Sequence, residues 1–250
     1  MITPTPAFGA IIIGDEILSG KRQDGHFRQI INALNTRGLA LAWCEMLGDD
    51  PARITACLQR SMASGDIVFS FGGIGATPDD FTRQCAATAA SVELARHAGA
   101  VAEIEAQFGE GAYPKRVLMA DFPLGAELIP NPINRVAGFS LHHHHFLPGF
   151  PEMAWPMLAW VLDHHYAHLF HQQPTIEAAI MVLDAGESQL LDLMNTIVKR
   201  YPTLKLFSLP RLDKRRSIEL GVKGEPAAVS LAMDEIKAGV TAAGFEWNTI

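Results

Sequence analysis

The chain has 250 residues, 48% of them hydrophobic and 19% charged, with a net charge of −7 and three scattered cysteines. This length suffices for one large or two modest domains, and an acidic chain without a basic run is not expected to bind nucleic acid. No apolar segment reaches transmembrane length, no signal pattern opens the chain and the cysteines form no metal spacing, so we expect no membrane partner and a cytoplasmic location.

The first part of the chain alternates short apolar runs with amphipathic stretches. The apolar runs predict strands, and apolar residues spaced three and four apart predict helices. The expected order is a strand at 7–13, a helix at 26–37, a strand at 39–46, a helix from Pro51 with Asp50 as its N-cap, a strand at 67–71 and a helix at 82–92. Such alternation is typical of an α/β fold, with a parallel sheet covered by helices on both faces.

Each of these three strands runs into acidic residues. Asp15-Glu16 follows the first strand, Asp49-Asp50 the second and Asp79-Asp80 the third. Because the carboxyl ends of parallel strands share one rim of a sheet, we expect these acids to line one crevice, the usual ligand site of α/β proteins. The alternative is a set of ordinary turns with solvated acids and an aspartate N-cap.

The third strand enters a glycine-rich turn, residues 72–80, before the next helix. Glycines let backbone N–H groups approach an anion closely, and the N-terminus of the helix adds a partial positive charge. Carboxylates beside a phosphate repel it unless a metal ion lies between them. The turn therefore predicts a site for phosphate together with a divalent cation.

The stretch from 93 to 169 carries weaker signals. We expect a continued helical region at 93–110, turns with a short strand within 124–129, and a helix at 152–169 after the Pro148-Gly149 turn. The run of four histidines, residues 142–145, predicts a strand with side chains on alternating faces. At most two of them could then share one ion, so a metal site in this run is the alternative interpretation.

Beyond a linker at 171–174, the pattern changes to strand, helix, two strands and helix. The expected elements lie at 176–183, 188–201, 205–209, 217–223 and 226–243. This order predicts a small α+β domain. We therefore expect two domains, 1–170 and 171–250. A basic cluster of Arg211, Lys214, Arg215 and Arg216 is expected to cap a loop.

Four motifs together resemble the N-terminal family of competence/damage-inducible protein A (CinA), which belongs to the molybdopterin-binding, molybdenum-cofactor-biosynthesis-like domains. They are GDEILSG at 14–20, GDD at 48–50, GGIGATPDDFT at 72–82 and LPGFPEM at 147–153, in the order of the family. The resemblance implies a three-layer αβα domain with a mostly parallel sheet, followed by a small α+β domain. It also implies a homo-oligomer.

The resemblance also implies site residues. Asp49 and Asp80 match the aspartates with which related adenylyltransferases act, so both are expected to be catalytic and to hold a divalent metal, Mg²⁺ or Co²⁺. The motifs further assign phosphate or ligand binding to Gly14, Asp15, Glu16, Ser19, Gly72, Gly73, Gly75, Thr77, Asp79, Thr82, Pro148 and Gly149. Phe81 departs from the family pattern and is expected to narrow the pocket. Gly25 and His26 stand where many members have Thr-Asn.

By this resemblance, the chain is expected to be a metal-dependent nucleotide pyrophosphatase that hydrolyses ADP-ribose- or FAD-like dinucleotides. One alternative is a molybdopterin-binding or adenylyl-transfer protein of molybdenum-cofactor metabolism, with molybdopterin as its ligand. A second alternative is a non-catalytic nucleotide-binding module. All three use the same crevice and a small nucleotide or pterin ligand.

Overall fold

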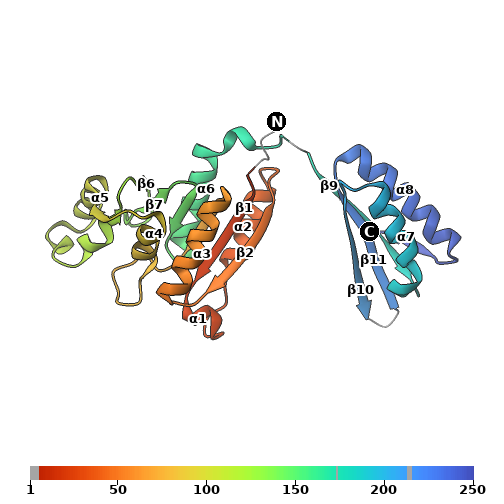
Figure 1. The fold of residues 1–250 in the computed structure, drawn as a ribbon, viewed down its shortest axis with the longest axis horizontal. Coiled ribbons are helices and arrows are strands. Elements are labelled where there is room, and N and C mark those ends of the chain that lie inside the picture. The colour runs from red at the N-terminus through yellow and green to blue at the C-terminus, as the bar shows by residue number, and fades with distance from the viewer. Residues whose placement is uncertain (1–5, 173, 213–215) are drawn as a thin grey trace. The chain divides into compact units, whose positions relative to one another are not determined.

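The computed structural model describes residues 6–172, 174–212 and 216–250 of the chain. These residues belong to two compact units, Met1–Phe170 and His171–Ile250 (Figure 1). Two members of the expected basic cluster, Lys214 and Arg215, lie outside the described residues. None of the described helices combines the length and the apolar character that a membrane span requires.

The first unit is built on a six-stranded sheet with the order β2-β1-β3-β8-β7-β6. Four neighbouring strands run parallel, and β7 and β6 continue the sheet antiparallel. The strands are β1 (Phe8–Ile13), β2 (Leu41–Leu47), β3 (Ile67–Phe71), β6 (Glu127–Ile129), β7 (Gly138–Leu141) and β8 (His144–Leu147). The predicted α/β class with a mostly parallel sheet is confirmed.

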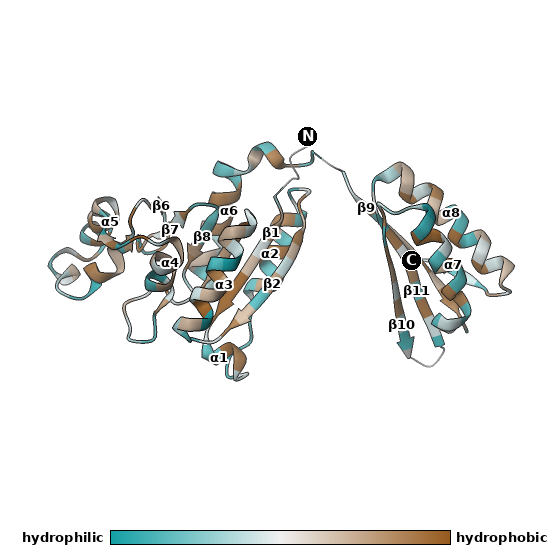
Figure 2. Cartoon of the chain, viewed as in Figure 1, coloured by the Kyte–Doolittle hydropathy of each residue, from teal (hydrophilic) through white to brown (hydrophobic). Residues whose placement is uncertain are grey.

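Helices cover both faces of this sheet, and the alternation of β1 side chains shows how. Ile11 and Ile13 belong to the core under one set of helices, whereas Ala10 and Ile12 belong to the core under the other set. Figure 2 shows the apolar character of β1 as brown colours along the strand. The first set is α3 (Pro51–Ser64), α4 (Thr82–Ala90) and α5 (Ala98–Phe108), and the second is α2 (His26–Asn35) and α6 (Pro151–His165). This arrangement is the three-layer αβα sandwich.

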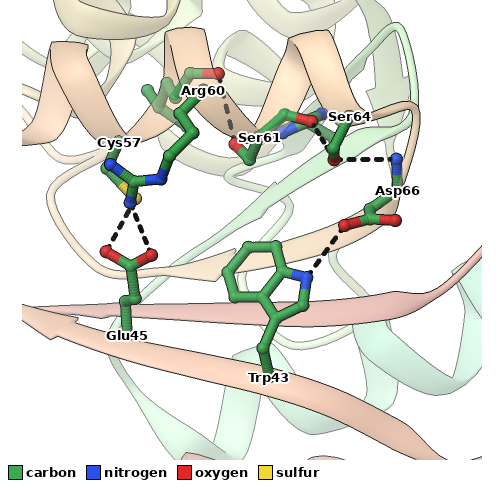
Figure 3. A network of polar contacts seen from close by, with 9 residues as sticks. Trp43, Glu45, Cys57, Arg60, Ser61, Ser64 and Asp66 are labelled. Carbon is green, nitrogen blue, oxygen red and sulfur yellow. Dashed lines mark hydrogen bonds and ion pairs between the residues drawn. The ribbon is translucent and has the colours of Figure 1, made fainter.

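Helix α3 begins where the sequence predicts, at Pro51. The Asp50 carboxylate accepts hydrogen bonds from the N–H groups of Ala52 (2.9 Å) and Arg53 (3.2 Å), and Gly65 ends the helix with φ 75°. Polar side chains then fix α3 and the strand after it to the edge strand β2 (Figure 3). Arg60 pairs with Glu45, and Trp43 Nε1 donates to Asp66 at 2.9 Å.

The expected helical region at 93–110 is wrong in its first part. Residues Leu94–Arg96 form a short strand, β4, paired antiparallel with β5 (Asp121–Pro123). Helix α5 starts afresh at Ala98 because His97 acts as its N-cap: the His97 Nδ1 accepts from the N–H of Ala100 at 3.1 Å. Two short 3₁₀ helices, η1 (Gly109–Ala112) and η2 (Arg116–Ala120), lead back to β5.

The histidine run does not form one strand, and this prediction is wrong. It forms a hairpin turn between β7 and β8, with His142 in the left-handed region at φ 54° and His143 exposed. The alternation of faces holds for the next two residues. His144 contacts Ser61 of α3 on one face, and His145 contacts Tyr166 at the end of α6 on the other. Helix α6 ends at His165, and η3 (Ala167–Leu169) follows.

The second unit is an antiparallel sheet with the order β10-β11-β9-β12. Both of its helices contribute to one apolar core with the strands, for example through Ile197 and Ile236. The elements are β9 (Ile176–Leu183), α7 (Glu187–Arg200), β10 (Lys205–Leu212), β11 (Arg216–Gly224), α8 (Pro226–Ala242) and β12 (Trp247–Thr249). The predicted small α+β fold is confirmed. Strand β12 was not expected, because its three residues are too few to show a period.

Candidate ligand-binding site

A cavity of about 470 Å³ lies where β1, β2, β3 and β8 end and their loops begin. The loops after these four strands all contribute to its walls, as the rule for parallel sheets predicts. The cavity is lined by Ile13, Gly14, Glu16, Arg22, Asp49, Gly72, Gly73, Ile74, Gly75, Ala76, Thr77, Asp79, Asp80, Phe108, Met119, Asn131, Asn134, Val136, Pro148, Gly149, Phe150 and Met153.

The glycine turn presents a run of free backbone donors. Among the described residues, none accepts a hydrogen bond from the N–H of Gly73, Ile74, Gly75 or Ala76. The carbonyl of Gly73, in contrast, is bound by the N–H of Thr82 at 3.0 Å. All four residues line the cavity. Successive unpaired N–H groups in a turn form an anion-binding concavity, so the turn is suited to hold a phosphate.

Glycine is required in this turn for two reasons. Gly72 has φ 102°, and a Cβ there would lie 2.3 Å from the Ile13 carbonyl oxygen. A Cβ on Gly75 would lie 2.5 Å from Oδ2 of Asp80. That Asp80 oxygen accepts hydrogen bonds from the N–H (2.8 Å) and the hydroxyl of Thr77. Asp80 therefore braces the turn through one oxygen, and its Oδ1 accepts no bond from the described residues.

Asp15 and Asp49 hold the first two loops together. The N–H of Asp15 donates to Oδ2 of Asp49 at 2.9 Å, and the N–H of Asp49 donates to Oδ1 of Asp15 at 3.2 Å. Burial raises the pKa of the Asp49 carboxyl, and the nearby carboxylates of Asp15, Glu16 and Asp79 raise it further, against the opposing effect of the Asp15 N–H. The acids that follow separate strands are thus close enough to interact.

The cavity carries an excess of negative charge. Four carboxylates line it, those of Glu16, Asp49, Asp79 and Asp80, and Arg22 is the only cationic side chain among the described lining residues. Within the described parts of the chain, no three His, Cys, Asp or Glu side chains are arranged to hold a metal ion. A cation at this rim would therefore need oxygen ligands from the bound molecule as well.

Eleven of the fourteen site residues expected from the sequence line this cavity, and Asp15, Ser19 and Thr82 do not. Asp15 acts on Asp49, as described. Ser19 is exposed at the end of α1 (Asp15–Leu18). Thr82 is fully buried, and its hydroxyl donates a hydrogen bond to the Gly72 carbonyl oxygen at 3.0 Å. Thr82 therefore stabilises the turn without facing the cavity. The expectation that Phe81 narrows the pocket is wrong, because Phe81 packs against the core instead.

The motifs in the sequence did not indicate the apolar side of the cavity or its amides. Phe108, Met119 and Val136 come from segments without a clear motif. Asn131 is buried and donates to Oδ1 of Asn134 (2.8 Å), whose own Nδ2 has no acceptor among the described residues. The cavity thus combines apolar and polar lining residues, as small-molecule sites commonly do.

His26 links two of the turns, although the family pattern has another residue there. Its ring is buried, stacks on Phe71 at 4.6 Å and places Nε2 3.1 Å from the Gly149 carbonyl oxygen. Burial lowers the pKa of His26, so the ring is neutral near pH 7. A Cβ on Gly149 would lie 3.4 Å from the Cα of Gly72, which shows how closely the two turns approach.

Comparisons with known proteins agree with this geometry. The family model described as a probable molybdopterin binding domain matches residues 9–168. A CinA-like protein of Syntrophus aciditrophicus is 33% identical over 57% of this chain and 36% of its own length. One of Syntrophotalea carbinolica is 29% identical over 71% of this chain and 45% of its own length. The matched segments thus span less than half of these relatives.

A solved structure shows the same fold. The crystal structure of the protein CinA from Thermoplasma acidophilum, described as having unknown function, superposes with a TM-score of 0.58. It is 27% identical in sequence and covers 63% of this chain and 97% of its own. The part of this chain that the CinA structure covers corresponds in size to the first unit, which contains the cavity. The residues matched by the family model also lie in this unit.

Proposed function

The chain belongs to the CinA-like family of molybdopterin-binding domains, and from this premise we propose that it is a metal-dependent nucleotide pyrophosphatase acting on ADP-ribose- or FAD-like dinucleotides. The observation that supports this proposal is the glycine turn, whose four consecutive N–H groups are unpaired among the described residues and border a cavity lined by carboxylates. Free donors beside carboxylates suit a phosphate that arrives together with a cation.

The glycine turn and the start of α4 would hold one phosphate group. The N–H groups of residues 73–76 donate to its oxygens, and the N-terminal end of α4 adds a favourable partial charge. Arg22 lines the same cavity and, within the described chain, makes no ion pair. It is available to the second phosphate of a diphosphate. The apolar wall with Phe108 and Met119 would receive a base or another flat ring.

The residues present fit a divalent cation in one particular way. Mg²⁺ is commonly bound by one or two carboxylates together with phosphate oxygens and water, rather than by a complete protein cage. Asp49 and Asp80 each keep one carboxylate oxygen that accepts no hydrogen bond from the described residues. These two oxygens would hold the ion, which agrees with the finding that no three such side chains form a ready site.

The reaction would be hydrolysis of the phosphoric anhydride. A water oxygen bonds to one phosphorus, the anhydride oxygen leaves with the other phosphorus, and two monophosphates result. A bound divalent ion supplies neutralisation of the phosphate oxygens and a more acidic water. The chain itself orients the diphosphate through the turn and keeps Asp49 in place through the N–H of Asp15.

The decisive experiment combines a substrate panel with a matched pair of variants. The chain is incubated with ADP-ribose, FAD or ATP and with Mg²⁺ or Co²⁺, and the products are followed by phosphorus NMR. We expect two monophosphates from ADP-ribose or FAD with the wild type and a loss of about 100-fold or more in Asp49→Asn, a magnitude typical of removing one electrostatic contact to the transition state. Asp50→Asn is the control, since Asp50 caps α3. Equal rates in the two variants would contradict the proposal.

Molybdopterin binding with adenylyl transfer is the second candidate, and the family match itself favours it. The cavity also offers a free amide donor, Asn134 Nδ2, beside its apolar wall, which suits the edge of a pterin. Incubation with molybdopterin and ATP separates the candidates, because adenylylated pterin replaces the two monophosphates. Thermal stabilisation by these ligands without turnover would instead indicate the non-catalytic binding module.

A further inference from the structure

Arg83 is a buried cation without a carboxylate partner. It is the second residue of α4, directly behind the glycine turn, and only 4% of it is exposed. Among the described residues it forms no ion pair. Arginine is seldom buried without a paired charge, because removing the guanidinium from water is costly. Because this desolvation is costly, the buried position of the Arg83 guanidinium suggests a specific role.

The guanidinium of Arg83 binds three backbone carbonyls from two separate segments. Nη2 donates to the carbonyl of Gly75 in the turn, and Nη1 donates to the carbonyls of Leu118 and Asp121 (3.2 Å for the latter). Leu118 and Asp121 stand on either side of Met119 in the chain, and Met119 lines the cavity. One side chain therefore connects the anion-binding turn to the segment that forms the apolar wall.

This connection also fixes which way a peptide group of the turn faces. The Gly75 carbonyl points to Arg83, and in a trans peptide the following N–H, that of Ala76, points the opposite way. The Thr82 N–H holds the Gly73 carbonyl on the same principle, which directs the N–H of Ile74 away from α4. Two of the four free donors thus owe their orientation to bonds that the carbonyls make with α4.

We propose that Arg83 is the positioning residue that sets the spacing between the phosphate-binding turn and the Met119 wall, and that its charge favours a bound diphosphate. This inference rests on the proposed function for its ligand. Arg83 does not touch the ligand. It holds the Gly75 peptide in the donating orientation and places a buried positive charge behind the turn, where the low dielectric strengthens its attraction for the phosphate.

The test measures loop order and ligand affinity separately in the full chain. Arg83→Gln removes the charge and part of the fork, and Arg83→Lys keeps the charge but cannot reach all three carbonyls. Arg96→Gln is the matched control, because Arg96 pairs with the carboxylate of Asp121 and has no contact with Gly75. Deuterium exchange is followed in peptides that cover 72–82 and 116–123, and affinity for inorganic pyrophosphate with Mg²⁺ is measured by calorimetry.

We expect faster exchange in both segments of Arg83→Gln and Arg83→Lys, and not at 72–82 in Arg96→Gln. Pyrophosphate affinity should fall by about tenfold in Arg83→Gln, because the buried charge behind the turn and the hold on the Gly75 peptide are both lost, and by less in Arg83→Lys, which keeps the charge. Unchanged exchange at 72–82 in Arg83→Lys, or wild-type affinity in Arg83→Gln, would overturn the inference. A wild type that binds no pyrophosphate would refute the proposed function and the ligand part of this inference, while the exchange results still decide the positioning role.

Discussion

Strands β3 and β8 have a cavity of the first unit at each of their two ends, and the polar groups around the two cavities differ in whether they are hydrogen-bonded. At the carboxyl ends, four backbone N–H groups of the glycine turn stay unpaired among the described residues. At the amino ends, a cavity of about 430 Å³ is lined by five histidines, and its most buried one is fully engaged. His145 lies 2.8 Å from the Ser140 hydroxyl through Nδ1 and 2.7 Å from the Tyr166 hydroxyl through Nε2.

The two cavities show that the type of a residue does not decide whether its polar groups are free to bind a ligand. Histidines are common ligands, and a run of four of them attracts attention in the sequence. Both ring nitrogens of the buried His145, however, are hydrogen-bonded to side chains of the first unit. Residues 73–76 of the glycine turn carry no ionisable side chain, but among the described residues their N–H donors remain free for a ligand. Changes at the carboxyl ends should therefore alter binding, and changes at the amino ends should alter stability.

The largest effect is expected from Gly75→Ala at the carboxyl ends. The new Cβ would displace the Asp80 carboxylate, which then loses its bonds to Thr77 and no longer braces the turn. We expect turnover of ADP-ribose to fall by about 100-fold, as when a transition-state donor is lost. The protein should stay folded, because only the end of a side chain must move. Circular dichroism and phosphorus NMR check the two parts.

A matched glycine variant controls for the substitution itself. Gly25 lies outside the cavity lining, has φ −114°, and a Cβ there would make an ordinary 3.4 Å contact with Trp155. Gly25→Ala should retain wild-type turnover. If the two alanine variants behave alike, the turn has no special part in the reaction, and the contrast between the two ends loses its functional meaning.

The next effect is expected at the amino ends, in His145→Ala. The variant leaves the hydroxyls of Ser140 and Tyr166 without their shared partner and opens a cavity in the core. Together these changes should lower the free energy of unfolding by about 2–4 kcal/mol. Pyrophosphate affinity should not change. Urea denaturation checks the first expectation and calorimetry the second.

His143→Ala provides the control for this prediction, since His143 is exposed in the hairpin turn. Its unfolding free energy should stay within about 0.5 kcal/mol of the wild type. A loss of affinity in His145→Ala without a loss of stability would reverse the comparison, because it would place a functional group at the amino ends.

A smaller effect is expected when the pH is lowered. Burial lowers the pKa of His145 to about 3 and that of His144 to about 4, and the neighbouring histidines contribute. The unfolded chain, with ordinary histidines near pKa 6.5, binds more protons than the folded chain below that pH. Stability is therefore complete above about pH 6.5 and decreases as the pH falls towards 4.

Each buried histidine contributes at most about 1.4 kcal/mol per pH unit to this slope. Urea denaturation between about pH 6.5 and pH 5 measures it. His145→Gln should reduce the slope of the unfolding free energy against pH by the contribution of one proton. An identical slope in the wild type and in His145→Gln would mean that His145 takes up a proton as readily when folded as when unfolded.

The same comparison explains how far the sequence could be interpreted. Local spacing predicted β3, the helix after Pro51 and the acids at the strand ends, because periodicity and capping act over a few residues. It did not predict the break at His97 or the hairpin at His142, where tertiary pairing decides the backbone. The apolar wall of the cavity was missed for the same reason, since Phe108 and Met119 reach it only after a long excursion of the chain.

The neighbouring aspartates Asp49 and Asp50 could be told apart from the sequence. Both follow a strand, but Pro51 marks Asp50 as the N-cap, and the resemblance assigns Asp49 to the site. In the structure, Asp50 Oδ1 accepts from two N–H groups of α3, whereas Asp49 lines the cavity and has a raised pKa. The capping role of Asp50 was thus predicted from local sequence and is confirmed, whereas the place of Asp49 at the cavity depends on the fold that brings the strand ends together.

The smallest effect is expected from Asp50→Ala, which tests whether Asp49 and Asp50 have different roles. Loss of the N-cap should lower the free energy of unfolding by about 1 kcal/mol, because two N–H groups of α3 lose their acceptor. Turnover and pyrophosphate affinity should stay at the wild-type level. Asp49→Ala should show the reverse pattern, in which turnover and pyrophosphate affinity fall. Its free energy of unfolding should stay the same or rise, because the carboxylates of Glu16 and Asp79 no longer face a like charge at position 49. Both variants losing affinity equally would mean that the loop after β2 acts as one unit, and that the structure divides the roles of its aspartates too sharply.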